Sequence, residues 1–290
     1  MADTFVLVDV DCVIVAYNSS ADLSSCLGSL AQQQEVTVTT TVVDNASADA
    51  EDSVDVARRY GASVVANRVN RGFGPAVNQG VAEGSGDWVL IVNPDARLRP
   101  DAVRTMLATA KLASDIGCVG PRVVDADGVE YPSRRRFPSV WMAAGHAVLG
   151  RVWPTNPATR RYHNAAPSDR ASTVDWVSGC CMLLPRRVWQ QLGGFDPSYF
   201  MYLEDVDLCW RSRQAGWRTV WEPAATVEHV GGRSSRSRPL RSIVHHHRGA
   251  ARFYWRSARR WHRPVTWPLA VMALIARAGV QAATHARARR

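Results

Sequence analysis

Hydrophobic and polar positions in the N-terminal third of the chain form a regular series of short apolar runs and longer amphipathic stretches. The apolar runs, which are rich in β-branched residues, predict strands over residues 11–17, 36–44, 62–67 and 87–93. The stretches between them carry apolar residues at helical spacing and predict helices over residues 21–33, 51–60 and 75–83. Strands that alternate with helices are typical of an α/β fold with a parallel sheet, which binds ligands beyond the carboxyl ends of its strands.

Polar residues follow each of the four predicted strands. In chain order they are Tyr17-Asn18, Asp44-Asn45-Ala46-Ser47, Asn67 with Asn70-Arg71-Gly72-Phe73-Gly74, and Asn93-Pro94-Asp95. A turn or a helix cap explains each group taken singly, but four groups at one edge of a sheet predict a binding site. The glycine-rich segment 71–75 is compatible with two interpretations: backbone N–H groups that face a diphosphate, or a packing turn.

Several classes of protein are excluded by what the sequence lacks. Hydrophobic residues make up 46% and charged residues 21%, which is typical of a globular chain and not of a disordered one. No G-x-G-x-x-G or P-loop motif follows the first strand, and Lys111 is the only lysine. The six cysteines contain no C-x-x-C pair, so we expect buried, reduced thiols and neither a zinc site nor a disulfide framework.

The same pattern sets the expected location of the protein. The sequence contains no uncharged apolar run of about 18 residues, so it predicts no transmembrane helix. The first fifteen residues carry three aspartates and no basic residue, the wrong charge for a secretory signal. We therefore expect a cytoplasmic protein.

The motifs carry a family resemblance. In order they are VIVAYN, VVDNAS, NRVNRGFGPAVNQG, VLIVNPDARL, SGCCMLLPRRVWQQLGGFDPSYFMYLEDVDLCWRSRQAGW and VEHVGGRSS. From about residue 12 to residue 235 the chain resembles the family 2 inverting glycosyltransferases of the GT-A fold, and among them the bacterial rhamnosyltransferases. The resemblance implies a Rossmann-like nucleotide-diphospho-sugar transferase fold with a mostly parallel central sheet in residues 1–232. The composition of residues 233–290 predicts a basic helical tail after it.

The resemblance also implies a reaction and its substrates. The expected donor is a nucleotide sugar, with dTDP-L-rhamnose as the first choice, and the expected acceptor is a polyprenyl-diphosphate-linked sugar in cell-wall or polysaccharide synthesis. Tyr17 and Asp44 are then expected at the nucleotide base and ribose. Asn70, Gly72 and Asn78 are expected along the nucleotide and its diphosphate.

A metal site is implied at Asn93-Pro94-Asp95, where the family has a D-x-D motif. The first carboxylate is an amide here, so Asn93 is expected beside the donor and Asp95 is expected to be the principal ligand of Mn²⁺ or Mg²⁺. His229 matches a position at which some family members ligate the metal. Trp176 matches a segment that closes over the donor sugar, where a ring stacked on the sugar and a ring packed in the core are equal alternatives.

The segment Tyr202–Leu208 holds three carboxylates at the start of a helix predicted over residues 203–217. An acceptor hydroxyl that attacks a sugar must lose its proton, which requires a general base. The family pattern assigns this role to Asp205 and places Glu204 beside it at the acceptor site. Asp207 is expected to be structural.

The C-terminal segment has a composition of its own. Residues 231–290 contain fourteen arginines and no lysine, aspartate or glutamate, so the first 230 residues carry a net charge of −5 in a chain of +9. Interleaved Trp and Arg residues and a short apolar run near residues 268–276 predict a helix that lies on an anionic membrane surface. We therefore expect a peripheral protein on the inner face of the cell membrane, with no nucleic acid as a partner.

Two alternative functions remain open from the residues alone. A nucleotidyltransferase that makes nucleotide sugars shares the α/β architecture, although a glycine-rich start with a basic residue is missing after the first strand. A non-catalytic nucleic-acid-binding module would use the arginine-rich tail. The arginines at 134–136, in an irregular stretch predicted over residues 131–170, are interpreted either as part of an acceptor-side loop or as a solvated run.

Overall fold

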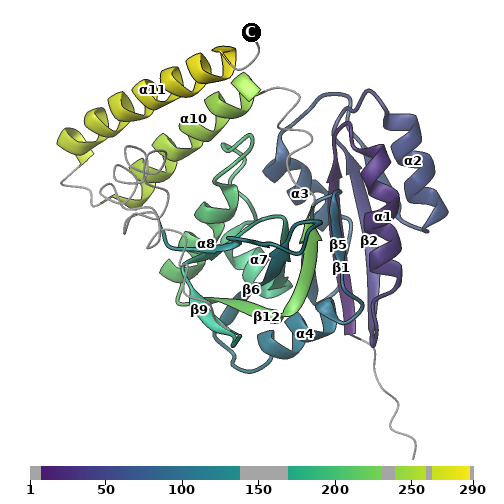
Figure 1. Cartoon of the computed structure of the whole chain (residues 1–290). Helices are drawn as coiled ribbons and strands as arrows, with labels where there is room; N and C mark the ends of the chain where they lie inside the picture. Colours follow the sequence, from purple (N-terminus) through teal and green to yellow (C-terminus); the bar gives the residue numbers. More distant parts are fainter. Residues whose placement is uncertain (1–7, 138–168, 230–238, 259–262, 288–290) are drawn as a thin grey trace, which may run out of the picture.

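The N-terminal part of the chain folds as the predicted alternation of strands and helices (Figure 1). The structure is a computed structural model, and it describes residues 8–137, 169–229, 239–258 and 263–287. The first elements are β1 (Val8–Ala16), α1 (Ser20–Ala31), β2 (Val36–Asp44), α2 (Ala50–Arg59), β3 (Ser63–Ala66), α3 (Phe73–Ala82) and β4 (Trp88–Val92). Each begins and ends within about three residues of its predicted range, which confirms the pattern-based assignment.

The remaining described elements complete the sheet and add the C-terminal helices. They are β5 (Ala96–Leu98), α4 (Ala102–Ala110), β6 (Ile116–Val124), β7 (Glu130–Tyr131), β8 (Arg134–Arg135), β9 (Ser172–Val174), β10 (Trp176–Val177), β11 (Cys181–Pro185), α7 (Arg186–Leu192), α8 (Glu204–Gln214), β12 (Arg218–His229), α10 (Pro239–Ser257) and α11 (Arg263–Arg287). Most of the irregular stretch predicted over residues 131–170 lies outside the described residues.

The described strands form a central, mostly parallel sheet in the order β3-β2-β1-β4-β11-β6-β12-β5. β1 pairs in parallel with both β2 and β4, so the chain switches direction across the sheet at β1. β11 is inserted antiparallel between β4 and β6. The carboxyl ends of β1, β2 and β4 therefore meet at one edge beside the switch point, which is where open α/β sheets bind ligands.

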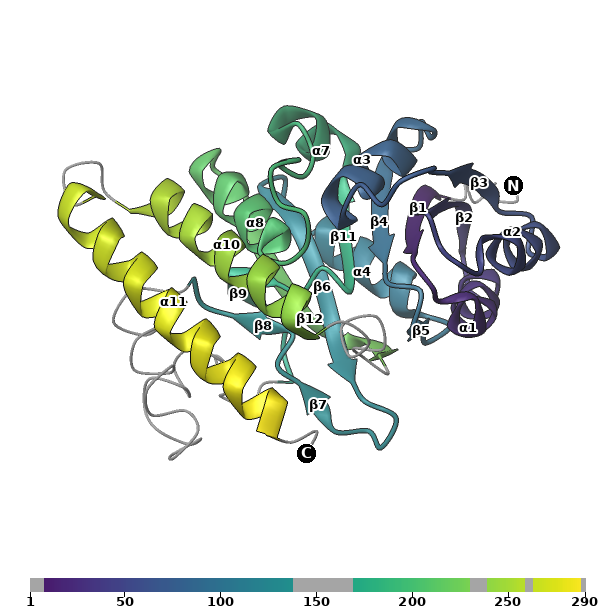
Figure 2. The same ribbon diagram turned by 90° about the horizontal axis from the view of Figure 1, so that it is seen from above.

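Helices cover both faces of this sheet (Figures 1 and 2). Alternate residues of the strands point to opposite faces, so Ile14 belongs to the core layer that contains residues of α1, α2 and α4, while its neighbour Val13 belongs to the layer that contains residues of α3, α7 and α8. Both side chains are at most 1% exposed. All six cysteines are free and buried in these layers, as predicted.

α10 and α11 lie side by side along one flank of the sheet domain (Figures 1 and 2). Phe253 of α10 is 2% exposed and packs in the core layer that contains α8, where its ring lies near the rings of Phe137 and Trp210. α10 is therefore part of the folded body, and the boundary expected at residue 232 does not separate it from the catalytic region. In the part of the chain that the structure describes, no helix combines the length and the hydropathy needed to cross a bilayer.

Candidate active site

Three predicted binding residues meet at the carboxyl ends of the central strands. Tyr17 follows β1, Asp44 ends β2 and Asn93 follows β4. The Asp44 side chain is 1% exposed; its Oδ1 accepts a hydrogen bond from the Ser47 backbone N–H at 3.1 Å. Its Oδ2 is buried and has no hydrogen-bond partner. Because a buried carboxylate oxygen without a partner is unfavourable, this atom marks a place where a ligand donor fits.

A network of amide side chains supports this edge of the sheet, and its central residue was not singled out from the sequence. Asn45 is 2% exposed, and its Nδ2 donates to Asn70 Oδ1 at 3.1 Å and to the Gly72 carbonyl at 3.0 Å. Its Oδ1 accepts from Asn67 Nδ2 at 3.2 Å and from the Arg71 backbone N–H at 3.0 Å. The signal in the sequence was its position directly after Asp44, but an Asn after a strand also caps many turns.

The glycine-rich segment before α3 is a packing turn and not a phosphate cradle. The backbone N–H of Gly72 donates to Asn70 Oδ1 at 2.9 Å, and the N–H of Phe73 donates to the Phe200 carbonyl at 2.7 Å. Gly72 has φ +91°, and a Cβ at this position would lie 2.4 Å from the Phe200 oxygen. The expected contact of Gly72 with the diphosphate is therefore not supported, because its amide is already bonded within the protein.

Asn78 also differs from the expectation. Its Nδ2 donates to the Phe195 carbonyl at 2.8 Å, and its Oδ1 accepts from the Phe195 backbone N–H at 2.9 Å. Both ends of the amide are bonded to the segment that leads to the catalytic carboxylates. Asn78 is therefore a brace between α3 and that segment, and these contacts do not support its expected place along the nucleotide. Asn70 likewise uses its Oδ1 within the amide network.

The predicted metal residues come together at the end of β4. His229 Nε2, at the end of β12, lies 3.0 Å from Asp95 Oδ1 and 3.3 Å from Asn93 Nδ2. The Asp95 and His229 side chains are 11% and 15% exposed. No group of three or more His, Cys, Asp or Glu side chains with metal-binding geometry occurs among the described residues. The protein thus supplies one carboxylate and one imidazole at this position.

The short turn before β11 joins this cluster to the candidate base. The Cys180 carbonyl accepts from the Asn93 backbone N–H at 2.8 Å, and the Gly179 N–H donates to Asp205 Oδ2 at 2.9 Å. Burial and the nearby carboxylates Asp95 and Asp205 raise the pKa of Cys180 to about 11. The Asp95 cluster and Asp205, which are far apart in the sequence, are therefore held on either side of one turn.

Glu204 and Asp205, at the start of α8, have different environments. Glu204 is 6% exposed, and its Oε2 is buried without a partner. Burial, reinforced by the neighbouring Asp205, raises the pKa of Glu204 to about 8. Burial also raises the pKa of Asp205, but N–H groups of Gly179 and Val206 donate to its two oxygens and oppose this rise. Of the pair, Asp205 is the carboxylate that ionises first.

A strained turn leads into this pair. Tyr202 and Leu203 have φ +72° and +71°, a backbone conformation that residues other than glycine rarely adopt. α10 contacts this turn through Gly249, where a Cβ would lie 2.9 Å from the Tyr202 carbonyl oxygen. Strained backbone persists only where the surrounding structure holds it in place. α10 therefore contributes to the position of the two candidate carboxylates, Glu204 and Asp205.

Asp207 is structural, in agreement with its expected role. It is 0% exposed and accepts from Arg211 Nε at 2.7 Å and from Arg256 Nη1 at 2.7 Å. The second Nη of Arg256 donates to Asp196 Oδ2 at 2.7 Å. Arg256 belongs to α10. It is one of fourteen arginines in residues 231–290, and nothing in their composition distinguishes it as the partner of Asp207.

Two further expectations are decided by burial. Trp176 is 6% exposed, lies in the core layer of α8 and donates through Nε1 to the Arg136 carbonyl at 3.0 Å. This arrangement favours the core-packing alternative over a ring stacked on the sugar. Arg134 is 5% exposed and stacks at 3.6 Å over the ring of Trp221, so the run 134–136 is not a simple solvated stretch.

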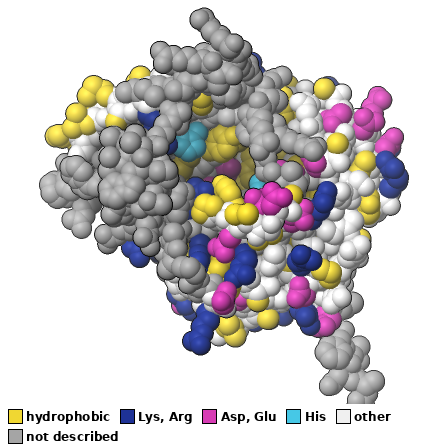
Figure 3. Space-filling model, in the orientation of Figure 1, with side chains coloured by type: hydrophobic (Ala, Val, Ile, Leu, Met, Phe, Trp, Pro, Cys, Tyr) yellow, Lys and Arg dark blue, Asp and Glu magenta, His cyan; other side chains and the backbone are white. Residues whose placement is uncertain are grey.

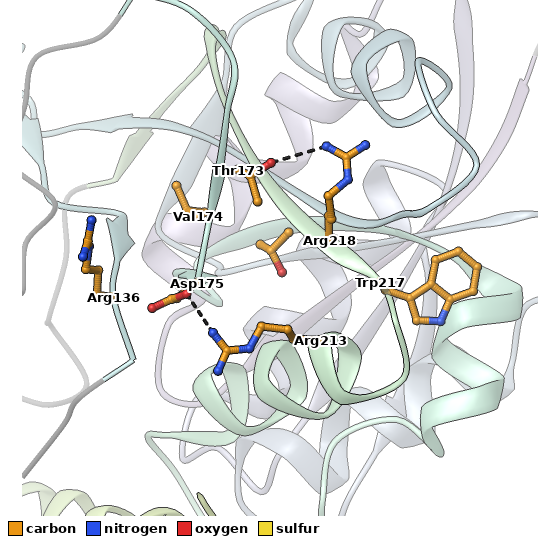
Figure 4. A pocket seen from close by; sticks show the side chains of 8 residues that line it. Arg136, Thr173, Val174, Asp175, Arg213, Trp217 and Arg218 are labelled. Carbon is orange, nitrogen blue, oxygen red and sulfur yellow. Dashed lines mark hydrogen bonds and ion pairs between the residues drawn. The ribbon is translucent and has the colours of Figure 1, made fainter.

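The face of the molecule above the carboxyl ends of the strands is hollowed, and histidine, acidic and hydrophobic side chains gather there (Figure 3). A cavity of about 390 Å³ lies elsewhere, between the β9 region and the end of α8 (Figure 4). Two of its three arginines are paired, Arg213 with Asp175 at 3.1 Å and Arg218 with Asp115 at 2.7 Å; the third is Arg136. It contains none of the predicted site residues and is not a candidate for the reaction.

Sequence comparison agrees with the geometry. Residues 9–262 match the family described as "Glycosyltransferase like family 2". The N-acetylglucosaminyl-diphospho-decaprenol L-rhamnosyltransferase of Mycobacterium tuberculosis (strain ATCC 25618 / H37Rv) is 36% identical over 269 residues, which cover 89% of this chain and 88% of that protein. Rhamnosyltransferase WbbL of Escherichia coli (strain K12) is 29% identical over 154 residues, 52% of this chain and 55% of that protein.

Solved structures show the same fold. The mannosyltransferase PcManGT from Pyrobaculum calidifontis, in complex with GDP-Man and Mn²⁺, superposes with a TM-score of 0.61 over 96% of this chain and 79% of that chain, at 17% identity. GalNAc-T7 with UDP, GalNAc and Mn²⁺ gives a TM-score of 0.58 over 77% of this chain and 44% of that chain, at 16% identity. At such identities the likeness establishes the GT-A fold alone.

Proposed function

The chain belongs to glycosyltransferase-like family 2, and from this premise we propose that it transfers L-rhamnose from dTDP-L-rhamnose to a polyprenyl-diphosphate-linked sugar in cell-wall synthesis. Family membership decides for glycosyl transfer over nucleotidyl transfer and over a non-catalytic nucleic-acid-binding module. The rhamnose donor and the lipid-linked acceptor are supported by the 36% identity, over 89% of the chain, to a rhamnosyltransferase whose name gives such an acceptor.

The observation that carries the proposed mechanism is the arrangement around the turn at residues 178–180. Asp95 and His229 lie on one side of it, and Asp205 with Glu204 lies on the other. A transferase needs positive charge near the departing diphosphate and a base near the attacking hydroxyl. This arrangement supplies places for both.

We infer that the nucleotide binds at the carboxyl ends of β1 and β2. Asp44 Oδ2, which is buried without a partner, accepts a hydrogen bond from the pyrimidine ring, and Tyr17 lies beside the base. Asn93, whose Nδ2 lies 3.3 Å from His229 Nε2, is placed beside the donor. Since Gly72 and Asn78 are bonded within the protein, they act by holding the walls of the site.

Asp95 and His229 would hold a divalent cation, Mn²⁺ or Mg²⁺. Their side-chain atoms are 3.0 Å apart, and a carboxylate oxygen with an imidazole nitrogen is a donor set that Mn²⁺ accepts, so the residues present fit such an ion. Because Asp95 and His229 would supply only two protein ligands, phosphate oxygens of the donor would be needed as further ligands. When bound, the ion neutralises negative charge on the leaving diphosphate.

Asp205 acts as the general base. The acceptor hydroxyl attacks the anomeric carbon from the face opposite the diphosphate and passes its proton to Asp205, while the bond to the diphosphate oxygen breaks, which inverts the configuration. Glu204, whose pKa is raised to about 8, keeps its proton near neutral pH and leaves Asp205 as the ionised member of the pair.

The C-terminal helices place the enzyme at a membrane surface as a peripheral protein. Val265, Leu269, Met272 and Ile275 of α11 are each 57–70% exposed and recur at helical spacing. An apolar stripe on a helix in a segment of fourteen arginines without an acidic residue is typical of an interfacial helix.

A donor panel tests this function. The full-length protein is incubated with Mn²⁺, synthetic farnesyl-diphospho-N-acetylglucosamine and either dTDP-L-rhamnose, UDP-glucose or GDP-mannose, and the glycosylated lipid is measured. We expect transfer from dTDP-L-rhamnose alone and its loss in EDTA. Faster transfer from another donor would refute the rhamnose assignment, and undiminished transfer in EDTA would refute the metal requirement.

A further inference from the structure

A groove beside the catalytic carboxylates has no role in the mechanism described so far. It has a volume of about 680 Å³ and lies between the loop 198–201, α10 and α11. Its walls include Phe200, Met201, Trp255 and Trp267 as apolar side chains and Arg248 and Arg252 as cationic ones. This volume is in the range of sites that hold a small organic ligand.

The cationic side of the groove is formed by one face of α10. Arg248 and Arg252 are four residues apart, so they lie one above the other on the helix, and both are exposed. No described residue pairs a carboxylate with either guanidinium, and the described lining of the groove contains no acidic residue. Two adjacent, unneutralised guanidinium groups are suited to the two phosphates of a diphosphate.

The other side of the groove is aromatic. Trp255 is 48% exposed and Phe200 is 38% exposed, which is unusual for such large apolar side chains. The rings of Trp255 and Trp267 lie 5.4 Å apart and join α10 to α11. A hydrocarbon chain that covered these rings would remove apolar surface from water, which is favourable in proportion to the area buried.

The groove is connected directly to the catalytic pair. The loop 198–201 forms one wall, and Glu204 follows it within three residues. Gly249 lines the groove and at the same time packs on the Tyr202 carbonyl oxygen. A ligand held on α10 would thus have its reactive end close to the turn that presents Asp205.

We propose that this groove binds the diphosphate and the first isoprene units of the lipid-linked acceptor, with Arg248 and Arg252 on the phosphates and Trp255, Phe200 and Trp267 on the hydrocarbon. The assignment rests on the proposed function, because a polyprenyl-diphosphate acceptor combines the two chemistries that the groove presents. The groove is therefore the acceptor's lipid site, and it is distinct from the edge of β1 and β2 at which the donor binds.

Binding of farnesyl diphosphate to the full-length protein, followed by calorimetry, tests this assignment. We expect the double variant Arg248→Ala/Arg252→Ala to lower the affinity at least tenfold. The variant Arg58→Ala/Arg59→Ala, which removes the same charge from exposed positions of α2, serves as the control and should bind like the wild type. We also expect Trp255→Ala to weaken farnesyl diphosphate but not inorganic pyrophosphate. Unchanged affinity in the Arg248→Ala/Arg252→Ala variant overturns the assignment.

Other outcomes identify a different occupant and would equally overturn the proposal. Equal affinity for pyrophosphate and farnesyl diphosphate would mean an anion site without a lipid component. If the Arg248→Ala/Arg252→Ala variant lost binding to phosphatidylglycerol vesicles and kept its affinity for farnesyl diphosphate, the groove would be a bilayer contact. Calorimetry of dTDP-L-rhamnose binding without acceptor separates the two levels: its absence in the wild type contradicts the proposed function, whereas its retention in a variant that binds no farnesyl diphosphate concerns the groove alone.

Discussion

Two adjacent carboxylates at the start of α8 show how environment divides chemical roles between similar residues. A helix N-terminus favours ionised carboxylates. Burial outweighs this effect at Glu204, whose Oε2 has no partner and whose pKa is raised to about 8. Asp205 is stabilised in its ionised form by two backbone N–H groups. The pair therefore holds one proton near neutral pH, and its charge is concentrated on Asp205.

Glu204 makes the stability of the protein depend on pH. Because the folded state holds this proton more tightly than the unfolded state, its stabilising contribution is fully present below about pH 4.5 and is lost as the pH rises through about 8. We expect Glu204→Gln to reduce the change in the free energy of unfolding between pH 5 and pH 8 by at least about 1 kcal/mol, since one pKa unit corresponds to about 1.4 kcal/mol. Urea unfolding at pH 5, 6.5 and 8 measures it, with the exposed Glu83→Gln as the control. Parallel profiles for wild type and Glu204→Gln would contradict the pKa assignment.

We expect metal binding to depend on Asp95, the proposed carboxylate ligand. Removing its carboxylate leaves His229 as the remaining proposed protein ligand, so we expect Asp95→Ala to abolish most of the increase in dTDP affinity that Mn²⁺ produces. Calorimetry of dTDP with and without Mn²⁺ measures the increase. Asp127→Ala, an exposed loop position, should retain the wild-type value. The same increase in Asp95→Ala and wild type would refute the role of Asp95.

At the scale of the elements, α10 packs on the folded body, which the basic composition of its sequence did not predict. Arg256 of this helix forms ion pairs with the fully buried Asp207 and with Asp196, and Phe253 packs in the core beside α8. Together with Gly249 on the Tyr202 turn, these contacts connect the tail to the first turn of the catalytic helix. α10 is therefore a support of the candidate active site as well as part of the C-terminal hairpin that it forms with α11.

Loss of the Arg256 anchor should destabilise the protein and displace the catalytic carboxylates. Asp207 keeps Arg211 as a partner, so we expect Arg256→Met to lower the free energy of unfolding by roughly 1–3 kcal/mol, less than the loss of an isolated buried pair. We expect kcat to fall while the dTDP affinity is retained. Arg256→Lys should be intermediate, because an ammonium cannot span both aspartates.

Urea unfolding and steady-state kinetics of these variants, with Arg241→Met as an exposed control on the same helix, check this prediction. A chain that ends after residue 257 keeps Arg256, and we expect it to be more stable than one that ends after residue 232. Equal stability of the two truncated chains would show that α10 is not anchored in this way.

The pattern of the sequence predicted the N-terminal elements because apolar spacing directly reflects which face of a strand or helix is buried. The family resemblance, and not the pattern, brought Asn93, Asp95 and His229 to one candidate site, where the structure places them together. It did not predict the bonded states of Gly72 and Asn78, since an Asn or Gly near a strand end is equally suited to a ligand and to a neighbouring backbone group. Only the tertiary contacts with Phe195 and Phe200 decide between these uses.

At the scale of the whole molecule, positive charge and an exposed apolar stripe occur together in the C-terminal segment that contains α10 and α11. The apolar stripe Val265, Leu269, Met272 and Ile275 belongs to the same segment as the fourteen arginines. Each basic residue near an anionic leaflet contributes about 1 kcal/mol at ordinary ionic strength. The body, with a net charge of −5 in residues 1–230, has the opposite sign, so we expect an anionic surface to repel it and to attract the hairpin.

Vesicle binding should therefore be strongly salt-dependent. We expect the full chain to cosediment with phosphatidylglycerol vesicles at 0.1 M salt, where the Debye length is about 10 Å, and largely to dissociate at 1 M, where it is about 3 Å. Phosphatidylcholine vesicles should bind little protein. Salt-independent binding would indicate that insertion of the apolar stripe dominates, and equal binding to neutral vesicles would refute the electrostatic attraction.

The most direct test of the proposed function compares wild type with Asp205→Asn in rhamnosyl transfer from dTDP-L-rhamnose to farnesyl-diphospho-N-acetylglucosamine. The amide keeps the shape of the side chain and removes its basicity. We predict a fall in kcat of about 100-fold or more, the effect of losing a general base, with the affinity for dTDP unchanged. Transfer by Asp205→Asn at a rate near that of the wild type would contradict the assignment of the catalytic base.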